Sequence, residues 1–160
     1  SLYPVNLITY HDDWGTERDT FFSEKMMEEI VFQPTKRIVD HIKSKNVIFE
    51  FHSCGNITRF IPYMIQLGVD FLQIQRRAVD IPAMKAKYGD KIGFSIWLEG
   101  AEFGVSYTKE ALTEKIKNTI NLYGKGGGAN INTMEHNPEL LWHIVSELYA
   151  CSREFYDLER

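Results

Sequence analysis

Five strand-like runs, each followed by a helical stretch, constrain the fold of this chain more than any other feature of its sequence. The runs are residues 7–11, 47–56 (which passes from a strand into a polar turn), 69–75, 92–100 and 129–133. They recur roughly every 20 to 45 residues, which leaves room for a helical crossover between parallel strands. The pattern predicts an α/β fold of about five βα units, with parallel strands and outer helices.

Two architectures contain such units, an open doubly wound sheet and a (βα)8 barrel. The strands favour the barrel, because each is apolar on one face and polar on the other toward its C-terminal end. A central strand of a doubly wound sheet would be apolar on both faces, whereas a barrel strand can present polar groups at the mouth of the barrel. Five units are too few to close a standard barrel. We therefore expect a partial (βα)8 TIM barrel that forms a single domain over residues 1–160.

Helix-capping residues support this division of the chain. Ser23, Asn56, Asp80 and Thr108 each stand just before an apolar pattern with helical spacing, where their side chains can accept a hydrogen bond from a free backbone N–H. Pro34 lies inside the first helical pattern and is expected to break or restart that helix.

The stretch from Val47 to Asn56 carries the most informative chemistry. Strand side chains alternate between faces, so Glu50, His52 and Cys54 share one face, opposite an apolar face. An imidazole and a thiol two residues apart can reach one metal ion. The alternative is that His52 is a hydrogen-bonded core histidine and Cys54 a small packing residue. Two candidate ligands are fewer than the three that a catalytic zinc site uses, so the residues alone leave both interpretations open.

Polar side chains also stand at the ends of other predicted strands. Asp12 and Asp13 follow the first strand, where they could bind substrate groups or a cation, or lie in a solvated turn. Arg76 follows the third strand and could hold an anionic substrate or lie on the surface. The candidates for substrate binding at these strand ends are Gln73, Gln75, Arg76 and Trp97.

Charge and cysteine content exclude several classes of function. A formal net charge of −4 with scattered Lys and Arg argues against nucleic-acid binding as the main role. The longest apolar runs are too short to span a membrane. Cys54 and Cys151 provide no disulfide framework, which fits a cytoplasmic protein. The chain starts at Ser1 without a methionine and enters a strand almost at once, which suggests a piece of a longer protein.

Several motifs together resemble the uroporphyrinogen decarboxylase family in its broad sense, which includes methyltransferases that move a methyl group from a corrinoid to a thiol. The motifs are residues 12–16, 34–40, 52–57, 68–70 and 126–128. The most specific is the His-x-Cys-Gly pattern at residues 52–55. The resemblance covers nearly the whole chain. It implies a (βα)8 barrel of about twice this length, of which this chain is the C-terminal part.

The resemblance also implies a zinc site. The methyltransferase branch binds zinc through the His and Cys of this motif, here His52 and Cys54, and through a later cysteine after the final strand. This sequence departs from the family at the third position, where Met134, Glu135 and His136 stand and no cysteine is found. Glu135 or His136 could complete the site, since both residue types bind zinc. In the decarboxylases a histidine in a similar loop helps to hold the porphyrinogen, and His136 could instead correspond to that residue.

The preferred hypothesis is a zinc-dependent methyltransferase that moves a methyl group from a methylated corrinoid on a partner protein to a thiol or pterin acceptor. A zinc ion turns a thiol into a reactive thiolate near neutral pH. Glu50 would orient the metal ligands, and Asp12 and Asp13 are further candidate catalytic groups. We prefer this hypothesis because the decarboxylases need no metal, which would leave a paired His and Cys without a role.

Two alternatives remain at this stage. A uroporphyrinogen decarboxylase of tetrapyrrole biosynthesis would use carboxylate-binding arginines and a cluster of aspartates, for which Arg76, Arg77 and Asp12 are the local candidates. A non-catalytic barrel fragment is the third hypothesis. An incomplete barrel exposes an unpaired strand edge, so we expect a fragment to self-associate and the isolated chain to be inactive.

Overall fold

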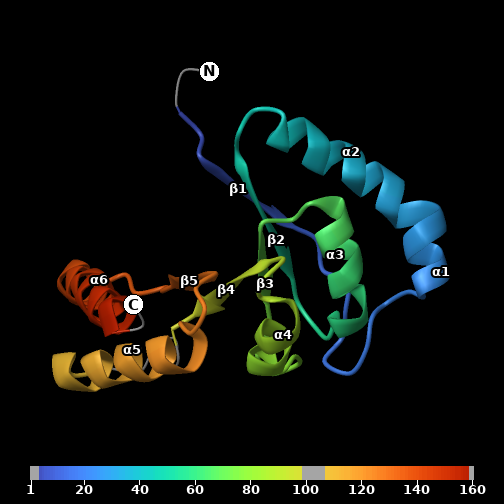
Figure 1. The fold of residues 1–160 in the computed structure, drawn as a ribbon. Helices are drawn as coiled ribbons and strands as arrows, with labels where there is room; N and C mark the ends of the chain where they lie inside the picture. The colour runs from blue at the N-terminus through green and yellow to red at the C-terminus, as the bar shows by residue number, and fades with distance from the viewer. Residues whose placement is uncertain (1–3, 99–106, 159–160) are drawn as a thin grey trace. The chain divides into compact units, whose positions relative to one another are not determined.

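The computed structural model describes residues 4–98 and 107–158, in which strands and helices alternate along the chain (Figure 1). The strands are β1 (Leu7–His11), β2 (Ile48–Ser53), β3 (Phe71–Ile74), β4 (Gly93–Trp97) and β5 (Ala129–Asn132). The helices are α1 (Glu24–Met26), the π-helix η1 (Met27–Val31), α2 (Phe32–Lys43), the 3₁₀-helix η2 (Thr58–Phe60), α3 (Ile61–Leu67), α4 (Ile81–Tyr88), α5 (Lys109–Tyr123) and α6 (Pro138–Leu158). The expected strand at residues 92–100 extends into residues that lie outside the described part.

The strands are parallel and stand in the sheet in chain order, β1-β2-β3-β4-β5. A doubly wound sheet reverses its strand order at a switch point, whereas a barrel adds each new strand on the same side. The predicted α/β fold with a partial, barrel-like sheet is therefore confirmed. Among the described strands, β1 pairs with β2 alone and forms one edge of the sheet.

Contacts divide the chain into two compact units, Ser1–Ser95 and Ile96–Arg160. The first contains β1 to β3 and begins β4, and the second contains the end of β4 together with β5, α5 and α6. Within the second unit, α5 and α6 lie side by side (Figure 1) and share a core that includes Ile116 and Ile144. The single domain over residues 1–160 stays a prediction.

The two faces of β2 have opposite character, as its alternating sequence predicts. Phe49 and Phe51 are fully buried, Tyr10 of β1 contacts both rings, and α2 packs against this strand and against α3 (Figure 1). Burial of each phenylalanine contributes about 2–3 kcal/mol to the stability of this layer. Because consecutive side chains alternate, the same packing directs Glu50 and His52 to the other face of the sheet.

The predicted caps form in the structure. The side chains of Ser23, Asp80 and Thr108 accept hydrogen bonds from the backbone N–H three residues later, at 3.0–3.2 Å. Asn56 accepts a hydrogen bond from Thr58 N at 3.1 Å, ahead of η2 and α3. These bonds begin the helices at the ends of strands and turns, and so hold the strand ends in place.

Pro34 does not end the helical path. The chain is helical from Glu24 to Lys43, but it passes through the π-helical segment η1 before α2 restarts at Phe32. The wider π turn precedes the proline, whose ring would clash with the carbonyl four residues earlier in a regular α-helix. The helix therefore restarts, which is one of the two expected outcomes, and the helical ribbon continues from α1 into α2 (Figure 1).

A helix that crosses a bilayer needs about 20 consecutive apolar residues. None of the helices in the described part of the chain meets the requirements of length and apolar character for a membrane span.

Candidate metal centre

The ends of β1 and β2 meet because the two strands are parallel and in register. His11 stands opposite His52, and the backbone N–H of Asp12 donates to the carbonyl of His52 at 3.2 Å. Asp13 lies shortly after the end of β1, and Cys54 directly follows the end of β2. Residues separated by about 40 positions in the sequence are thus brought to one corner of the sheet.

Asp13, His52 and Cys54 form a cluster of three potential metal ligands, called here the candidate metal centre. The Cys54 Sγ atom lies 3.5 Å from His52 Nε2, which lies 3.6 Å from Asp13 Oδ1. The three ligand atoms all lie within 4.8 Å of one another. Ligand atoms around a tetrahedral zinc are separated by about 3.3–3.8 Å, given zinc–ligand distances of about 2.0–2.3 Å. The donor set and its spacing therefore fit one zinc ion with an open fourth position.

Gln73 sets the orientation of the His52 ring. Its side-chain oxygen lies 2.8 Å from His52 Nδ1, and it is buried on β3 directly opposite His52. An amide oxygen can only accept a hydrogen bond, so Nδ1 carries the proton and donates a hydrogen bond to the Gln73 oxygen. Nε2 is then left with its lone pair directed at Cys54 and Asp13, which is the tautomer a metal requires.

The substitution Gln73→Leu is expected to lower zinc affinity about 10- to 100-fold, because the ring loses the acceptor that fixes its tautomer and orientation. Competition against a chromophoric chelator measures the affinity. Gln73→Glu, which keeps an acceptor oxygen at the same position, serves as the matched control and should retain zinc. Equal affinities for the Leu variant and the unmodified chain would contradict this role for Gln73.

Hydrogen bonding and burial together set the protonation of the cluster. The backbone N–H of Cys54 donates to Asp13 Oδ1 at 2.7 Å, and this bond lowers the pKa of the Asp13 carboxyl. The pKa of the Cys54 thiol is raised by burial and by the adjacent Asp13 carboxylate. The metal-free centre thus holds an ionised carboxylate beside a protonated thiol near neutral pH. Thiol ionisation there requires a cation, which is the usual behaviour of a cysteine metal ligand.

The turn after β1 and the turn after β2 hold the candidate metal centre in place. The Gly55 N–H donates to the Gln75 side chain at 2.9 Å, and the Asn56 N–H donates to the Thr16 carbonyl at 2.6 Å. Gly55 has a φ of +81°, and a β-carbon at this position would overlap the Gly15 carbonyl group. The close approach of the two glycine backbones is what allows Asp13 to reach Cys54.

Glu50 occupies a position deeper in the sheet. Its carboxylate is buried and accepts hydrogen bonds from the Thr9 hydroxyl at 3.0 Å and from the Ser95 hydroxyl. These bonds connect β2 with β1 and β4. The sequence assigned the orienting of metal ligands to Glu50, but the side chain on the His52 ring nitrogen is that of Gln73. A catalytic role for Glu50 stays a prediction.

His11 is the neighbour of the centre that sequence reasoning missed. Its ring stacks on that of His52, with centroids 4.4 Å apart and an interplanar angle of 30°. The only signal in the sequence is that two strands each end near a histidine. Their pairing depends on the register of β1 and β2, which no local pattern reveals.

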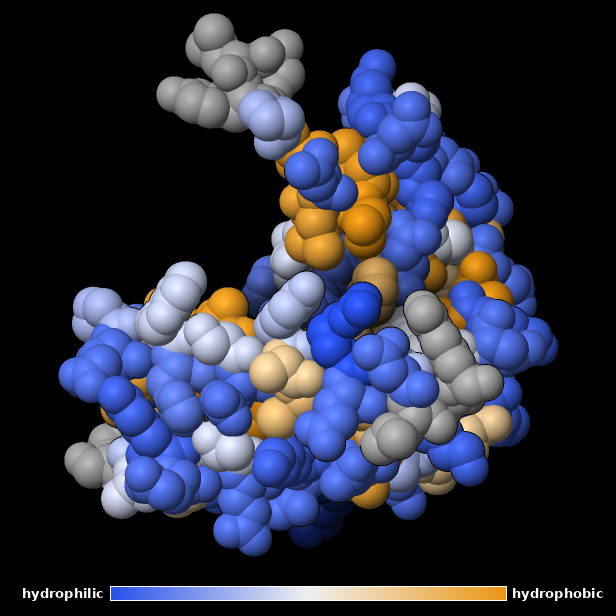
Figure 2. Space-filling view, turned by 60° about the vertical axis from the view of Figure 1, so that its left-hand side comes forward, coloured by the Kyte–Doolittle hydropathy of each residue, from blue (hydrophilic) through white to orange (hydrophobic). Residues whose placement is uncertain are grey.

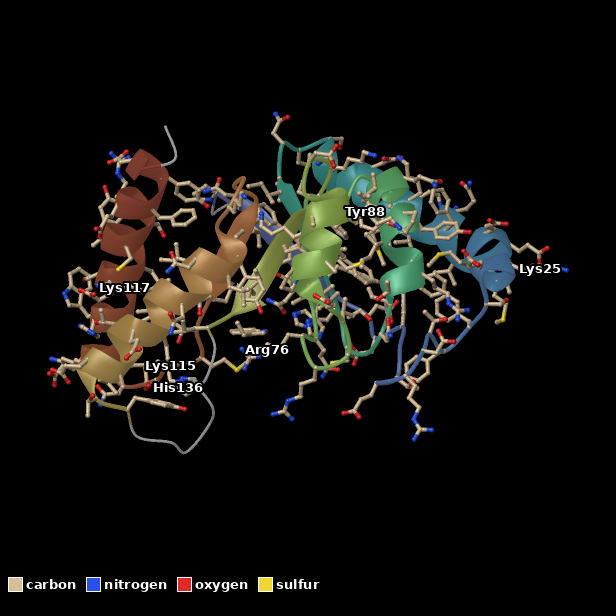
Figure 3. All side chains as sticks on the ribbon, turned by 60° about the horizontal axis from the view of Figure 1, so that its bottom comes forward. Lys25, Arg76, Tyr88, Lys115, Lys117 and His136 are labelled. Carbon is tan, nitrogen blue, oxygen red and sulfur yellow. The ribbon has the colours of Figure 1, made fainter. Side chains whose placement is uncertain are left out.

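The other predicted site residues are placed as follows. Asp12 is exposed beside the centre but is not one of its three ligands, and Gln75 is engaged with Gly55. Arg76 lies in the turn after β3 (Figure 3), and its role in substrate binding stays a prediction, as do those of Gln73 and Gln75. Trp97, at the end of β4, also stays a predicted substrate-binding residue.

Glu135 and His136, the expected third ligands, belong to the second unit, between β5 and α6. Figure 3 labels His136. Glu135 accepts a hydrogen bond from the Asn137 N–H at 2.7 Å. Their part in metal binding stays a prediction, whereas Asp13 already completes a set of three within the first unit.

Comparison with known proteins agrees with the fold. A family model described as uroporphyrinogen decarboxylase (URO-D) matches residues 5–96, which is more than half of the chain and contains all three residues of the candidate metal centre. No curated protein matches the sequence. Among solved structures, a methyltransferase from Methanosarcina mazei is similar, with a TM-score of 0.62 at 15% identity. The match covers 94% of this chain and 42% of that methyltransferase, so the chain spans less than half of its length.

Proposed function

The chain belongs to the uroporphyrinogen decarboxylase family, and on that premise we propose that it carries the metal-binding part of a zinc-dependent methyltransferase. The proposed reaction moves a methyl group from a methylated corrinoid on a partner protein to a thiol or pterin acceptor. The observation that carries the proposal is the convergence of Asp13, His52 and Cys54 at the C-terminal ends of parallel strands, the edge at which barrel enzymes place their active sites.

The residues of the chain would divide the work between holding a metal ion and shaping its surroundings. Asp13, His52 and Cys54 would hold zinc, and Gln73 keeps the imidazole of His52 in the ligating tautomer. Bound zinc would supply Lewis acidity, which allows a thiol acceptor to react as a thiolate near neutral pH. The buried Glu50, with its two hydroxyl partners, links β2 to β1 and to β4.

The methyltransferase is favoured over the tetrapyrrole decarboxylase on the chemistry of the donor set. A carboxylate, an imidazole and a thiol within 4.8 Å form a set typical of metal ligation, and decarboxylation without a metal would give that set no role. The similar fold of the Methanosarcina mazei methyltransferase is consistent with this choice.

The proposed function is tested by zinc content and methyl transfer measured on the same preparations. A full-length protein that contains this sequence is expected to bind about one zinc ion and to demethylate methylcobalamin when a thiol is present, followed by the absorbance of the cobalamin. His52→Ala is expected to lower both zinc content and rate at least about a hundredfold. Zinc binding without methyl transfer would remove the methyltransferase but leave the metal centre. Absence of zinc from the unmodified protein would remove both.

The zinc affinity of the centre is expected to rise about tenfold for each pH unit between pH 7 and about 8.5. Burial and Asp13 raise the pKa of the Cys54 thiol, so the thiol is protonated in this range and must release a proton when it binds zinc. Because binding releases a proton, a higher pH favours the bound state. Calorimetry in two buffers of different ionisation enthalpy measures the proton count, expected to be about one. Cys54→Ser should show much weaker binding, and full affinity that does not vary with pH would contradict Cys54 as a ligand.

A further inference from the structure

Ser53 is a buried polar residue on the apolar face of β2. Because side chains alternate along a strand, it shares this face with Phe49 and Phe51. Hydrophilic residues cover most of the face of the molecule that Figure 2 shows, whereas Ser53 is 0% exposed. A hydroxyl that loses contact with water needs hydrogen-bond partners within the protein. The partners of Ser53 therefore indicate what the hydroxyl does at this position.

The hydroxyl of Ser53 is bonded to both of the turns that carry ligands of the candidate metal centre. Its Oγ atom donates to the Cys54 carbonyl at 2.8 Å and accepts the backbone N–H of Trp14 at 2.9 Å. Because a hydroxyl has a single proton, the bond to Cys54 leaves its lone pairs to accept the N–H of Trp14. That N–H belongs to the peptide group between Asp13 and Trp14, so the bond fixes the backbone beside the Asp13 carboxylate.

The two turns exchange hydrogen bonds in both directions. The Trp14 N–H donates to the Ser53 side chain, and the Cys54 N–H donates to the Asp13 side chain at 2.7 Å. Each turn supplies one backbone N–H and one side-chain oxygen, as the two partners do in the capping box of a helix. Each bond holds the turns at the distance that the other bond requires. Loss of the Ser53 hydroxyl would leave the buried Trp14 N–H without this acceptor and release the Asp13 carboxylate from Cys54.

The ring of Trp14 anchors the same turn in a different way. The residue is 3% exposed, and its ring contacts those of Phe51 and Phe60, with centroids 4.5 and 6.3 Å away. Apolar packing is non-directional, so it holds Trp14 in the buried layer without setting the direction of its peptide group. The hydrogen bond to Ser53 supplies that direction.

We propose that Ser53 is a positioning residue of the candidate metal centre, whose hydroxyl holds the peptide group after Asp13 so that the Asp13 carboxylate lies beside Cys54 and His52. Ser53 does not itself face the metal, because it lies on the side of β2 opposite His52. The proposal rests on the proposed function only in taking Asp13 as a metal ligand. Ser53→Ala is expected to lower zinc affinity about 10- to 100-fold, as the loss of a residue that orients a ligand usually does.

A double-mutant cycle separates positioning from a general loss of stability. Zinc affinity is measured by competition with a chromophoric chelator for Ser53→Ala, Asp13→Asn and the double variant. If the hydroxyl acts through the Asp13 carboxylate, Ser53→Ala should weaken binding by less than about twofold when Asp13→Asn is already present. Weakening by the same factor in both backgrounds would show a merely structural role and overturn the proposal. Thr35→Val removes another buried hydroxyl, which donates to the Val31 carbonyl within a helix, and should bind zinc like the unmodified protein.

Amide hydrogen exchange of the metal-free, full-length protein that contains this sequence tests the same bonds without zinc. The N–H groups of Trp14 and Cys54 should exchange at least about a hundredfold more slowly than in an unstructured peptide. Ser53→Ala should speed the exchange of both at least about tenfold, and Thr35→Val should leave both rates unchanged. Free exchange of either N–H in the unmodified protein, or an unchanged Cys54 rate in Ser53→Ala, would overturn the proposal. If the unmodified protein bound no zinc, the proposed function would fail, and the exchange at Cys54 would still decide the role of Ser53.

Discussion

Replacing Gly55 with alanine is expected to destabilise the first unit by about 3–5 kcal/mol and to abolish zinc binding at micromolar metal. Gly55 has a φ of +81°, a region that costs a residue with a β-carbon about 1–2 kcal/mol. The new β-carbon would also overlap the Gly15 carbonyl and lie 2.6 Å from the Thr16 carbonyl oxygen. Backbone atoms on both sides leave no flexible side chain to move, so the two turns must separate.

The loss of metal binding is expected because the two turns hold Asp13 next to Cys54. Asp13 reaches Cys54 through a 2.7 Å hydrogen bond that forms only while the turn after β1 lies against the turn after β2. Separating the turns removes the carboxylate from the cluster of ligands. Urea unfolding followed by circular dichroism measures the first effect, and zinc titration measures the second.

Gly68→Ala is the matched control for this substitution. Gly68 ends α3 with a φ of +88°, but its β-carbon would have only side-chain atoms near it, at 3.8 and 4.0 Å. Alanine at this position would be strained by the left-handed backbone conformation but would clash with nothing. We therefore expect a loss of about 1–2 kcal/mol in the free energy of unfolding and normal zinc binding. If the two alanine variants unfolded at the same urea concentration, the close contact of the two turns would not exist in solution.

The parts of the fold that could be predicted from the sequence are those encoded within a few neighbouring residues. A cap such as Ser23 or Asp80 acts on an N–H three residues away, so its effect is visible in the sequence itself. The division of β2 into a face with Phe49 and a face with His52 follows from simple alternation. For the same reason, the juxtaposition of His52 and Cys54 was predicted correctly.

The parts that could not be predicted depend on strand register. Asp13 meets Cys54, and Gln73 meets His52, only because three strands pair in one particular alignment. A shift of a strand by one residue would turn its side chains to the opposite face, and no local pattern specifies the alignment. Gln73 was accordingly assigned to substrate and Glu50 to the metal ligands, while the structure places Gln73 on the imidazole. Only the register of β2 and β3 shows that Gln73 is the side chain that contacts the His52 ring.

The third zinc ligand is the point at which the structure and the family resemblance lead to different experiments. The resemblance to the family points to Glu135 or His136 for this ligand. The structure offers Asp13, whose carboxylate is ionised and 3.6 Å from His52 Nε2. One carboxylate, one imidazole and one thiolate would balance the charge of Zn²⁺ without a contribution from the second unit.

Replacing Asp13 with asparagine is therefore expected to lower zinc affinity about a hundredfold or more, while the stability of the metal-free chain stays within about 1 kcal/mol. The asparagine oxygen can still accept the Cys54 N–H, so the turn is kept, but a neutral amide is a poor zinc ligand. Asp12→Asn alters the adjacent exposed carboxylate that lies outside the cluster, and it should bind zinc like the unmodified chain. Competition titrations on both variants, with Glu135→Gln and His136→Ala beside them, distinguish the candidates. Zinc retained by Asp13→Asn but lost by either of the last two would move the third ligand to the second unit.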